Sequence, residues 1–183
     1  CIGTGTVGRS WARTFAEAGH CVTLHDANDS VAREAVRVLQ AELPQLAAAF
    51  TCAASLEAAL QGACYVQESG PESLAIKRNL FEAMNAVAGP ETLFGSSTST
   101  LPGSSFLCGL HISARSLVVH PTNPPHLVPL VELCRTGETS DETLDAVRAI
   151  MRGCRQTPVE IRKEIFGFAL NRLQAALVAE ALR

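Results

Sequence analysis

A histidine and a glutamate in two neighbouring apolar stretches could together remove and return a proton. His120 ends the run S-L-V-V-H, and Glu132 lies within L-V-P-L-V-E-L-C. The ordinary pKa of histidine lies near neutrality, so an imidazole at a strand end can take a proton from a hydroxyl group. If Glu132 faces His120, it would fix the imidazole tautomer and stabilise the charged ring. On local grounds alone, His120 could instead bind a backbone carbonyl and Glu132 could point to water.

Three glycines near the start of the chain could let a phosphate group approach the backbone. Gly3, Gly5 and Gly8 form G-T-G-T-V-G, where a strand would end and a helix would begin. The first glycine permits a tight turn, the second admits a pyrophosphate, and the third lets helix and strand pack closely. Alone, the motif is also compatible with an ordinary turn. Asp26 closes the following strand, and its carboxylate can accept hydrogen bonds from both ribose hydroxyls. No Arg or Lys follows before Arg33 to bind a 2′-phosphate, so the pattern favours NAD over NADP.

Hydroxyl and amide side chains provide further candidates for substrate contact. The row S-S-T-S-T at 96–100 follows an apolar run, and one hydroxyl could bond the substrate oxygen. An N-cap for a helix near Pro102 is an equal alternative. Asn171 lies early in the last helical pattern, where an asparagine requires a reason, such as orienting the histidine or the substrate.

These side chains need a sheet whose strands end at one edge, and the chain alternates between strand and helix patterns accordingly. Helices are predicted at 6–18, 30–43, after Ser55, and at 71–87, 141–152 and 165–183; strands are predicted at 21–24, 64–67, 93–96, 116–120, 128–133 and 158–161. We therefore expect an α/β fold, a Rossmann-like, doubly wound and mostly parallel sheet over 1–163. Residues 164–183 are expected to begin an all-α C-terminal domain that is truncated here.

The composition favours a soluble protein that acts on small molecules. The formal net charge is -3, and the 15 Lys and Arg residues are scattered, which argues against nucleic acid as a partner. Charged residues interrupt every hydrophobic stretch, so no membrane span is expected. Seven cysteines without a C-x-x-C pair indicate reduced thiols in the cytoplasm and neither a metal site nor a disulfide framework.

Ordered blocks of sequence resemble the 3-hydroxyacyl-CoA dehydrogenase family, and more closely its lambda-crystallin branch, which includes L-gulonate 3-dehydrogenase. The resemblance covers nearly the whole chain. It is carried by G-T-G-T-V-G-R-S-W at 3–11, P-E-S-L-A-I-K at 71–77, S-S-T-S-T at 96–100, H-P-T-N-P-P at 120–125, P-L-V-E-L at 129–133 and F-G-F-A-L-N-R-L-Q at 166–174. The sequence departs from the family at Phe166, where Pro or Ala is usual.

The resemblance implies NAD-dependent hydride transfer and a role for each matching residue. His120 would be the general base in oxidation, Glu132 its partner, Ser99 the residue that bonds the reacting oxygen, and Asn171 would complete the site. Besides the three glycines, contacts with NAD are implied for Thr6, Val7, Asp26, Glu72, Lys77 and Asn123. Without the resemblance, Glu72 and Lys77 would be interpreted as part of a solvated helix face.

The branch implies a small polyhydroxy acid as substrate, such as L-gulonate oxidised to 3-dehydro-L-gulonate. H-P-T-N-P-P and R-S-W are typical of this branch, whereas acyl-CoA enzymes carry H-F-F-N-P. The stretch between Asp26 and Glu72 is also shorter than the helical extension that helps to hold CoA in those enzymes. A 3-hydroxyacyl-CoA substrate and a non-catalytic, crystallin-like structural or NAD-binding role are the alternatives. The family further implies a homodimer formed through the C-terminal domain.

Overall fold

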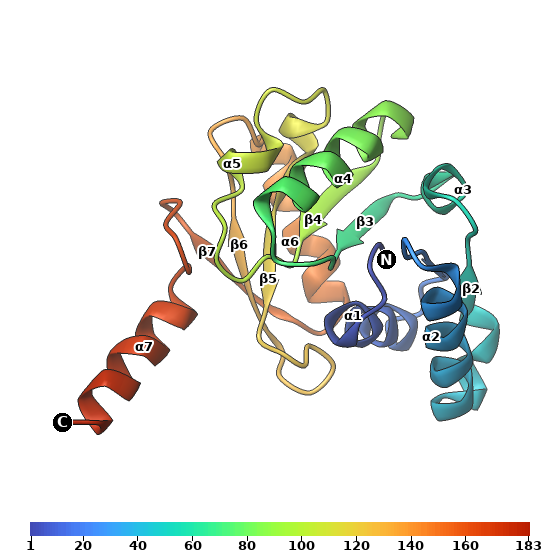
Figure 1. Cartoon of the computed structure of the whole chain (residues 1–183), viewed down its shortest axis with the longest axis horizontal. Coiled ribbons are helices and arrows are strands. Elements are labelled where there is room, and N and C mark those ends of the chain that lie inside the picture. Colours follow the sequence, from blue (N-terminus) through green and yellow to red (C-terminus); the bar gives the residue numbers. More distant parts are fainter.

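A twisted sheet lies between two layers of helices in the computed structural model, which describes residues 1–183 (Figure 1). Its strands are β1 (Val22–Leu24), β2 (Phe50–Cys52), β3 (Tyr65–Glu68), β4 (Leu93–Ser96), β5 (Ser116–Pro121), β6 (Leu130–Cys134) and β7 (Thr157–Ile161). The helices are α1 (Thr6–Glu17), α2 (Asp29–Glu42), α3 (Leu56–Leu60), α4 (Leu74–Val87), α5 (Ser104–Leu107), α6 (Asp141–Gly153) and α7 (Leu170–Ala181), with 3-10 turns at Pro44–Ala49 and Ser113–Arg115.

The strand order confirms the doubly wound, mostly parallel arrangement. β3, β4, β5, β6 and β7 are neighbours in that order, and β1 pairs with β2 beside them. Ile2 forms parallel bridges to both His25 and Glu68, and so connects the two groups of strands. All pairings are parallel except that between β5 and β6, which is antiparallel. The carboxyl ends of β3, β4 and β5 therefore meet at one edge, where ligands bind in such sheets.

Two apolar cores, one on each face of the sheet, fix the helices that carry the site. On one face α1, α2 and α6 pack against the sheet around residues such as Trp11, Leu117 and Val147. On the other face α3, α4 and α5 enclose Phe81 and Phe94. Burial of these side chains drives the layers together.

The structure differs from the sequence prediction in several elements, and α4 begins at Leu74 rather than at residue 71. β2 was not predicted, because a strand of three residues after an alanine-rich run is too short to show a period. The last helix was predicted from Ile165, but α7 begins at Leu170, because Gly167 and Phe168 adopt left-handed backbone conformations that a right-handed helix cannot contain. α7 buries none of its residues and projects away from the sheet in Figure 1.

Side chains cap the starts of three helices, whereas α1, α4, α5 and α7 begin without a capping side chain. The side chains of Asn28, Ser55 and Ser140 accept hydrogen bonds from backbone N–H groups at the starts of α2, α3 and α6. α1 starts at the glycine turn with no capping side chain and no acidic residue in its first turn.

None of the helices has the length and apolar character that crossing a membrane requires.

Candidate active site

The antiparallel pairing of β5 and β6 brings the predicted acid/base residues together. His120 lies directly opposite Glu132 in the register, and opposite residues of an antiparallel pair place their side chains on the same face. His120 Nδ1 lies 2.7 Å from Glu132 Oε2, and the two residues are only 5% and 4% exposed. Because an ionised carboxylate only accepts hydrogen bonds, Nδ1 carries a proton, and Nε2 is the ring nitrogen that can act as a base. Nε2 makes no hydrogen bond within the chain.

The second oxygen of Glu132 binds the start of α7. Glu132 Oε1 accepts hydrogen bonds from the backbone N–H groups of Ala169 and Leu170, each at 2.9 Å. Burial alone would raise the pKa of Glu132, but the hydrogen bonds from His120, Leu170 and Ala169 together lower it below its ordinary value. The positive end of the helix favours the same ionised form. Glu132 is therefore a carboxylate at neutral pH.

The Glu72 carboxylate binds several groups of the hydroxyl-rich segment that follows β4. Glu72 Oε1 accepts hydrogen bonds from the Thr98 and Thr100 hydroxyls and from the N–H groups of Ser99 and Thr100, at 2.7 to 3.0 Å. Asn171 Nδ2 donates to the Ser99 carbonyl at 2.7 Å. The Ser99 hydroxyl is exposed and makes no hydrogen bond within the chain, so it is available to a substrate oxygen.

Lys77 lies inside the protein, so the solvated-face interpretation is wrong for Lys77, whereas Glu72 is exposed. Lys77 is 1% exposed, and its Nζ lies 2.9 Å and 3.0 Å from the two carboxylate oxygens of Glu68. Glu72 precedes α4 rather than lying on it, and its Oε2 is 3.8 Å from the same ammonium group. A direct contact between Lys77 and a ribose stays a prediction, whereas its observed bonds go to Glu68 at the end of β3 and to the Gly70 carbonyl.

The glycine turn has the geometry that a dinucleotide requires. A Cβ atom on Gly3 would lie 2.7 Å from the Ser69 backbone, and one on Gly8 would lie 1.9 Å from the Gly3 carbonyl oxygen. A Cβ atom on Gly5 would meet nothing within 4 Å. Gly3 and Gly8 therefore serve the packing of the turn, whereas Gly5 leaves open space beside the uncapped N–H groups of α1. Thr6 and Val7 form that first helical turn, where a pyrophosphate would be favoured.

Asp26 lies beside the glycine turn as an ionised acceptor. Its Oδ2 accepts from the N–H and hydroxyl groups of Thr4, and its Oδ1 accepts from the Asn28 N–H. Burial would raise the pKa of Asp26, but these hydrogen bonds lower it below its ordinary value. The charge of Arg33 is paired with Asp29 at 2.6 Å, so it does not offset Asp26. These residues fit the ribose of NAD, which lacks a 2′-phosphate.

A polar network behind the site was missed by the sequence analysis. Ser97 Oγ accepts from Trp11 Nε1 at 3.1 Å and from Gln67 Nε2 at 2.7 Å, and lies 2.9 Å from Ser69 Oγ. It links α1 to the ends of β3 and β4. The polar residues at the ends of the apolar strands were the sequence signal that could have indicated this network. Asn123, by contrast, is exposed and its side chain bonds to no other residue of the chain, so its contact with NAD stays a prediction.

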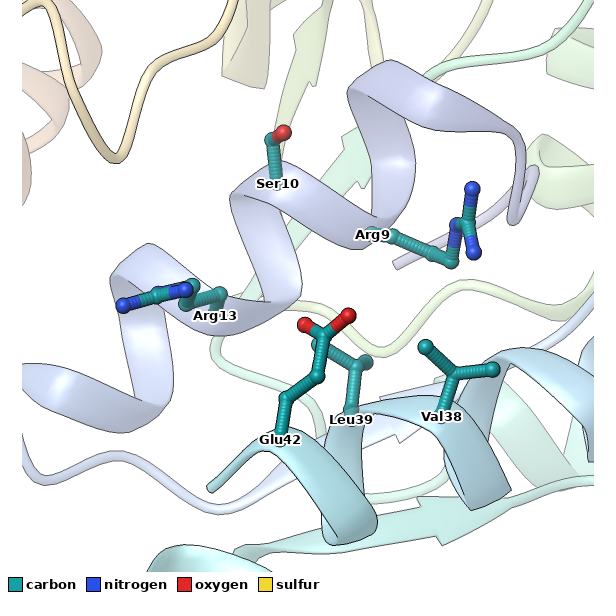
Figure 2. A pocket seen from close by; sticks show the side chains of 6 residues that line it. All are labelled: Arg9, Ser10, Arg13, Val38, Leu39 and Glu42. Atoms are coloured by element: carbon teal, nitrogen blue, oxygen red, sulfur yellow. The ribbon is translucent and has the colours of Figure 1, made fainter.

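A separate hollow of about 120 Å³ lies between α1 and α2. Figure 2 shows the Glu42 side chain reaching from α2 towards Arg9 and Arg13 on α1. Arg13 is also paired with Glu17 at 2.8 Å. The hollow is therefore lined by charges of both signs, and it includes neither the glycine turn nor His120.

Comparison with known proteins agrees with this geometry. The family described as "3-hydroxyacyl-CoA dehydrogenase, NAD binding domain" matches residues 1–165. The chain belongs to the 3-hydroxyacyl-CoA dehydrogenase family. Its cofactor is NAD, which the uncapped α1, the open space at Gly5 and the ionised Asp26 fit.

Relatives match along the entire chain. A lambda-crystallin homolog of Bos taurus is 40% identical and is matched over 61% of its length. An L-carnitine dehydrogenase of Streptomyces griseus is 35% identical and is matched over 57% of its length. The structure of an (S)-3-hydroxybutyryl-CoA dehydrogenase from Ralstonia eutropha superposes with a TM-score of 0.91 at 24% identity, over 98% of this chain and 68% of that one, which shows the shared fold. The chain thus spans about three fifths of the lambda-crystallin relatives.

Substitution of the glycines should separate folding from cofactor binding. We expect Gly5→Ala to fold normally but to bind NAD about ten- to hundredfold more weakly, because hydrogen bonds to a charged group contribute about 1.5–3 kcal/mol. Gly8→Ala should lose about 1–3 kcal/mol of stability, because its methyl group must displace the Gly3 carbonyl. Thermal unfolding and calorimetric titration with NAD measure both effects. Equal stability of the two variants, or normal NAD affinity in Gly5→Ala, would contradict these roles.

Substitution of Asp26 should change the choice of cofactor. Asp26→Ala is expected to weaken NAD binding and to reduce discrimination against NADP, because it removes the carboxylate that would repel a 2′-phosphate. Titration of both cofactors measures the ratio of dissociation constants. Glu82→Ala, which removes an exposed carboxylate on α4, is the control. An unchanged ratio in Asp26→Ala would show that another residue selects the ribose.

Proposed function

We propose that the protein catalyses NAD-dependent oxidation of the hydroxyl group of a 3-hydroxy acid. The observation that carries this proposal is the buried His120–Glu132 pair, in which the imidazole keeps Nε2 free as a proton acceptor. The pair lies at the end of β5, on the edge of the sheet where the glycine turn also opens. A proton acceptor and a dinucleotide site at one edge are what oxidation of an alcohol requires.

In this proposal the chain handles the proton, and NAD, when bound, supplies the acceptor for the hydride. His120 Nε2 takes the proton of the substrate hydroxyl as the hydride leaves the same carbon, so that the C–O bond becomes a carbonyl. Glu132 stabilises the imidazolium ion that forms, as a buried carboxylate does in hydrolase triads. The Ser99 hydroxyl donates to the reacting oxygen, and Asn171 holds the Ser99 segment through its carbonyl. In the reverse direction His120 returns the proton.

We propose a small polyhydroxy acid such as L-gulonate as the substrate. The lambda-crystallin homologs among the relatives support this branch of the family. The short connection between β1 and β3, which contains only α2, a 3-10 turn, β2 and α3, argues against the extension that holds CoA. A 3-hydroxyacyl-CoA is the second candidate, favoured by the family description and by the Ralstonia eutropha structure. A non-catalytic role remains the alternative suggested by the crystallin name.

The organisation of the whole protein is proposed along the same lines. We propose an NAD-binding domain over 1–163, followed from residue 164 by a helical domain through which two copies form a cytoplasmic homodimer. Direct NAD contacts are proposed for Thr6, Val7, Glu72, Lys77 and Asn123. The exposed side chains of Leu173 and Leu177 on α7 are consistent with a further domain packing there.

Substitution of the proposed base should abolish turnover without removing the cofactor. In the natural full-length protein, we expect His120→Gln to lower kcat by about 10²- to 10⁴-fold with NAD affinity unchanged. His126→Gln is the control, because that histidine lies in the loop that follows β5 and bonds Ser10 instead of Glu132. Assays with L-gulonate and 3-hydroxybutyryl-CoA run in parallel distinguish the substrates. Near-normal turnover of His120→Gln would eliminate the assigned base, and absence of turnover by the natural protein would favour the non-catalytic role.

A further inference from the structure

Two consecutive residues before α7 adopt left-handed backbone conformations. Gly167 has φ 76° and Phe168 has φ 48°. Both residues are buried, and Phe168 is 0% exposed. A bulky side chain rarely adopts this conformation, and such residues persist only where the surrounding contacts require them.

The turn and the residues that follow it contact the His120–Glu132 pair on one side and the Ser99–Thr100 segment on the other. The Phe168 ring packs against the His120 ring, with the centroids 5.4 Å apart and the planes at 41°. The next two N–H groups, of Ala169 and Leu170, bind Glu132 Oε1. The Gly167 N–H donates to the Thr100 carbonyl at 3.0 Å, and Asn171 binds the Ser99 carbonyl.

A continuous helix would destroy this arrangement. The sequence pattern predicts a helix from Ile165, in which the N–H groups of residues 169 and 170 would bond to the carbonyls of residues 165 and 166. Their donors would then be lost to Glu132, and the Phe168 side chain would leave the His120 ring. The left-handed pair delays the helix, so that its first free N–H groups lie at the carboxylate.

We propose that the Gly167–Phe168 turn is the positioning element that holds His120, Glu132 and the Ser99 segment in one reactive arrangement. Phe168 blocks one face of the imidazole and keeps the ring in the plane set by Glu132. The freed N–H groups of Ala169 and Leu170 fix the Glu132 carboxylate. The hydrogen bonds to the Thr100 and Ser99 carbonyls place the Ser99 hydroxyl, which is proposed to bond the substrate oxygen. This inference rests on the proposed function, because it assigns the turn to the same proton transfer.

Substitution of Gly167 by alanine tests the turn, because the added Cβ atom disfavours the left-handed backbone but makes little new steric contact. A Cβ atom there would meet only Asn171 Cβ and Arg172 Cγ, both at 3.8 Å, which is ordinary contact. We expect Gly167→Ala in the natural full-length protein to lower kcat about ten- to hundredfold with unchanged NAD affinity, because misplacement of catalytic groups by about 1 Å has effects of this size. Gly167→Asn should retain more activity, because asparagine tolerates the left-handed region.

Gly109→Ala is the matched control for strain. Gly109 has φ 82°, its Cβ atom would meet nothing within 4 Å, and it makes no contact with the site. Its variant should lose similar thermal stability but keep kcat. If Gly167→Ala and Gly109→Ala keep equal kcat, or if Gly167→Asn is no better than Gly167→Ala, the turn has only a structural role and the proposal is overturned.

A readout independent of turnover separates this proposal from the proposed function. The proton on His120 Nδ1, held by Glu132, should give a downfield NMR signal that disappears in His120→Gln. Gly167→Ala should broaden this signal through faster exchange with water, and Gly109→Ala should leave it unchanged. An unchanged signal in Gly167→Ala contradicts the positioning role. Absence of dehydrogenase activity in the natural protein, with the signal behaving as expected, would refute the proposed function alone.

Discussion

The carboxylate of Glu132 is the group on which the arrangement of the site depends. One oxygen fixes the proton on His120, and the other binds the first N–H groups of α7. The strand pair and the helix start are far apart in sequence, and this carboxylate joins them. Because its pKa in the folded protein is lowered, the stabilisation it contributes is complete above the ordinary glutamate pKa and is lost as the pH falls through the folded value.

The same chemistry recurs along the edge of the sheet. Asp26 binds the N–H groups of Thr4 and Asn28, and Glu72 binds those of Ser99 and Thr100. Glu68, paired with Lys77, accepts the N–H group of Gly70 at 2.6 Å. Loops that follow strands contain backbone donors without sheet partners, and a carboxylate satisfies several of them at once. The Ser99 hydroxyl and His120 Nε2 make no hydrogen bond within the chain, so they remain available for the proposed chemistry.

The features that could be predicted are those that depend on residue types and on short periodic patterns in the sequence. The glycine turn, the alternation of strands and helices, and the candidacy of His120 and Glu132 follow from residue types and periods. The pairing of that histidine with that glutamate depends on the register of β5 and β6, which requires the length of the loop between them. The turn at Gly167 could not be predicted, because F-G-F-A-L-N has an apolar helical period and tertiary contacts override it. The burial of Lys77 is equally a tertiary property, since it depends on Glu68 from a neighbouring strand.

The most direct test of this account is a carbon-13 NMR titration of the Glu132 side-chain carboxyl group, with its signal assigned by comparison with Glu132→Gln. The account predicts that the carboxyl group protonates below the ordinary pKa of glutamate, because the His120 ring and the α7 N–H groups bind the ionised form. The Ala169 and Leu170 amide signals should shift with the same midpoint. A midpoint at or above the ordinary value, or amide signals that do not respond, would contradict the claim that this carboxylate organises the site.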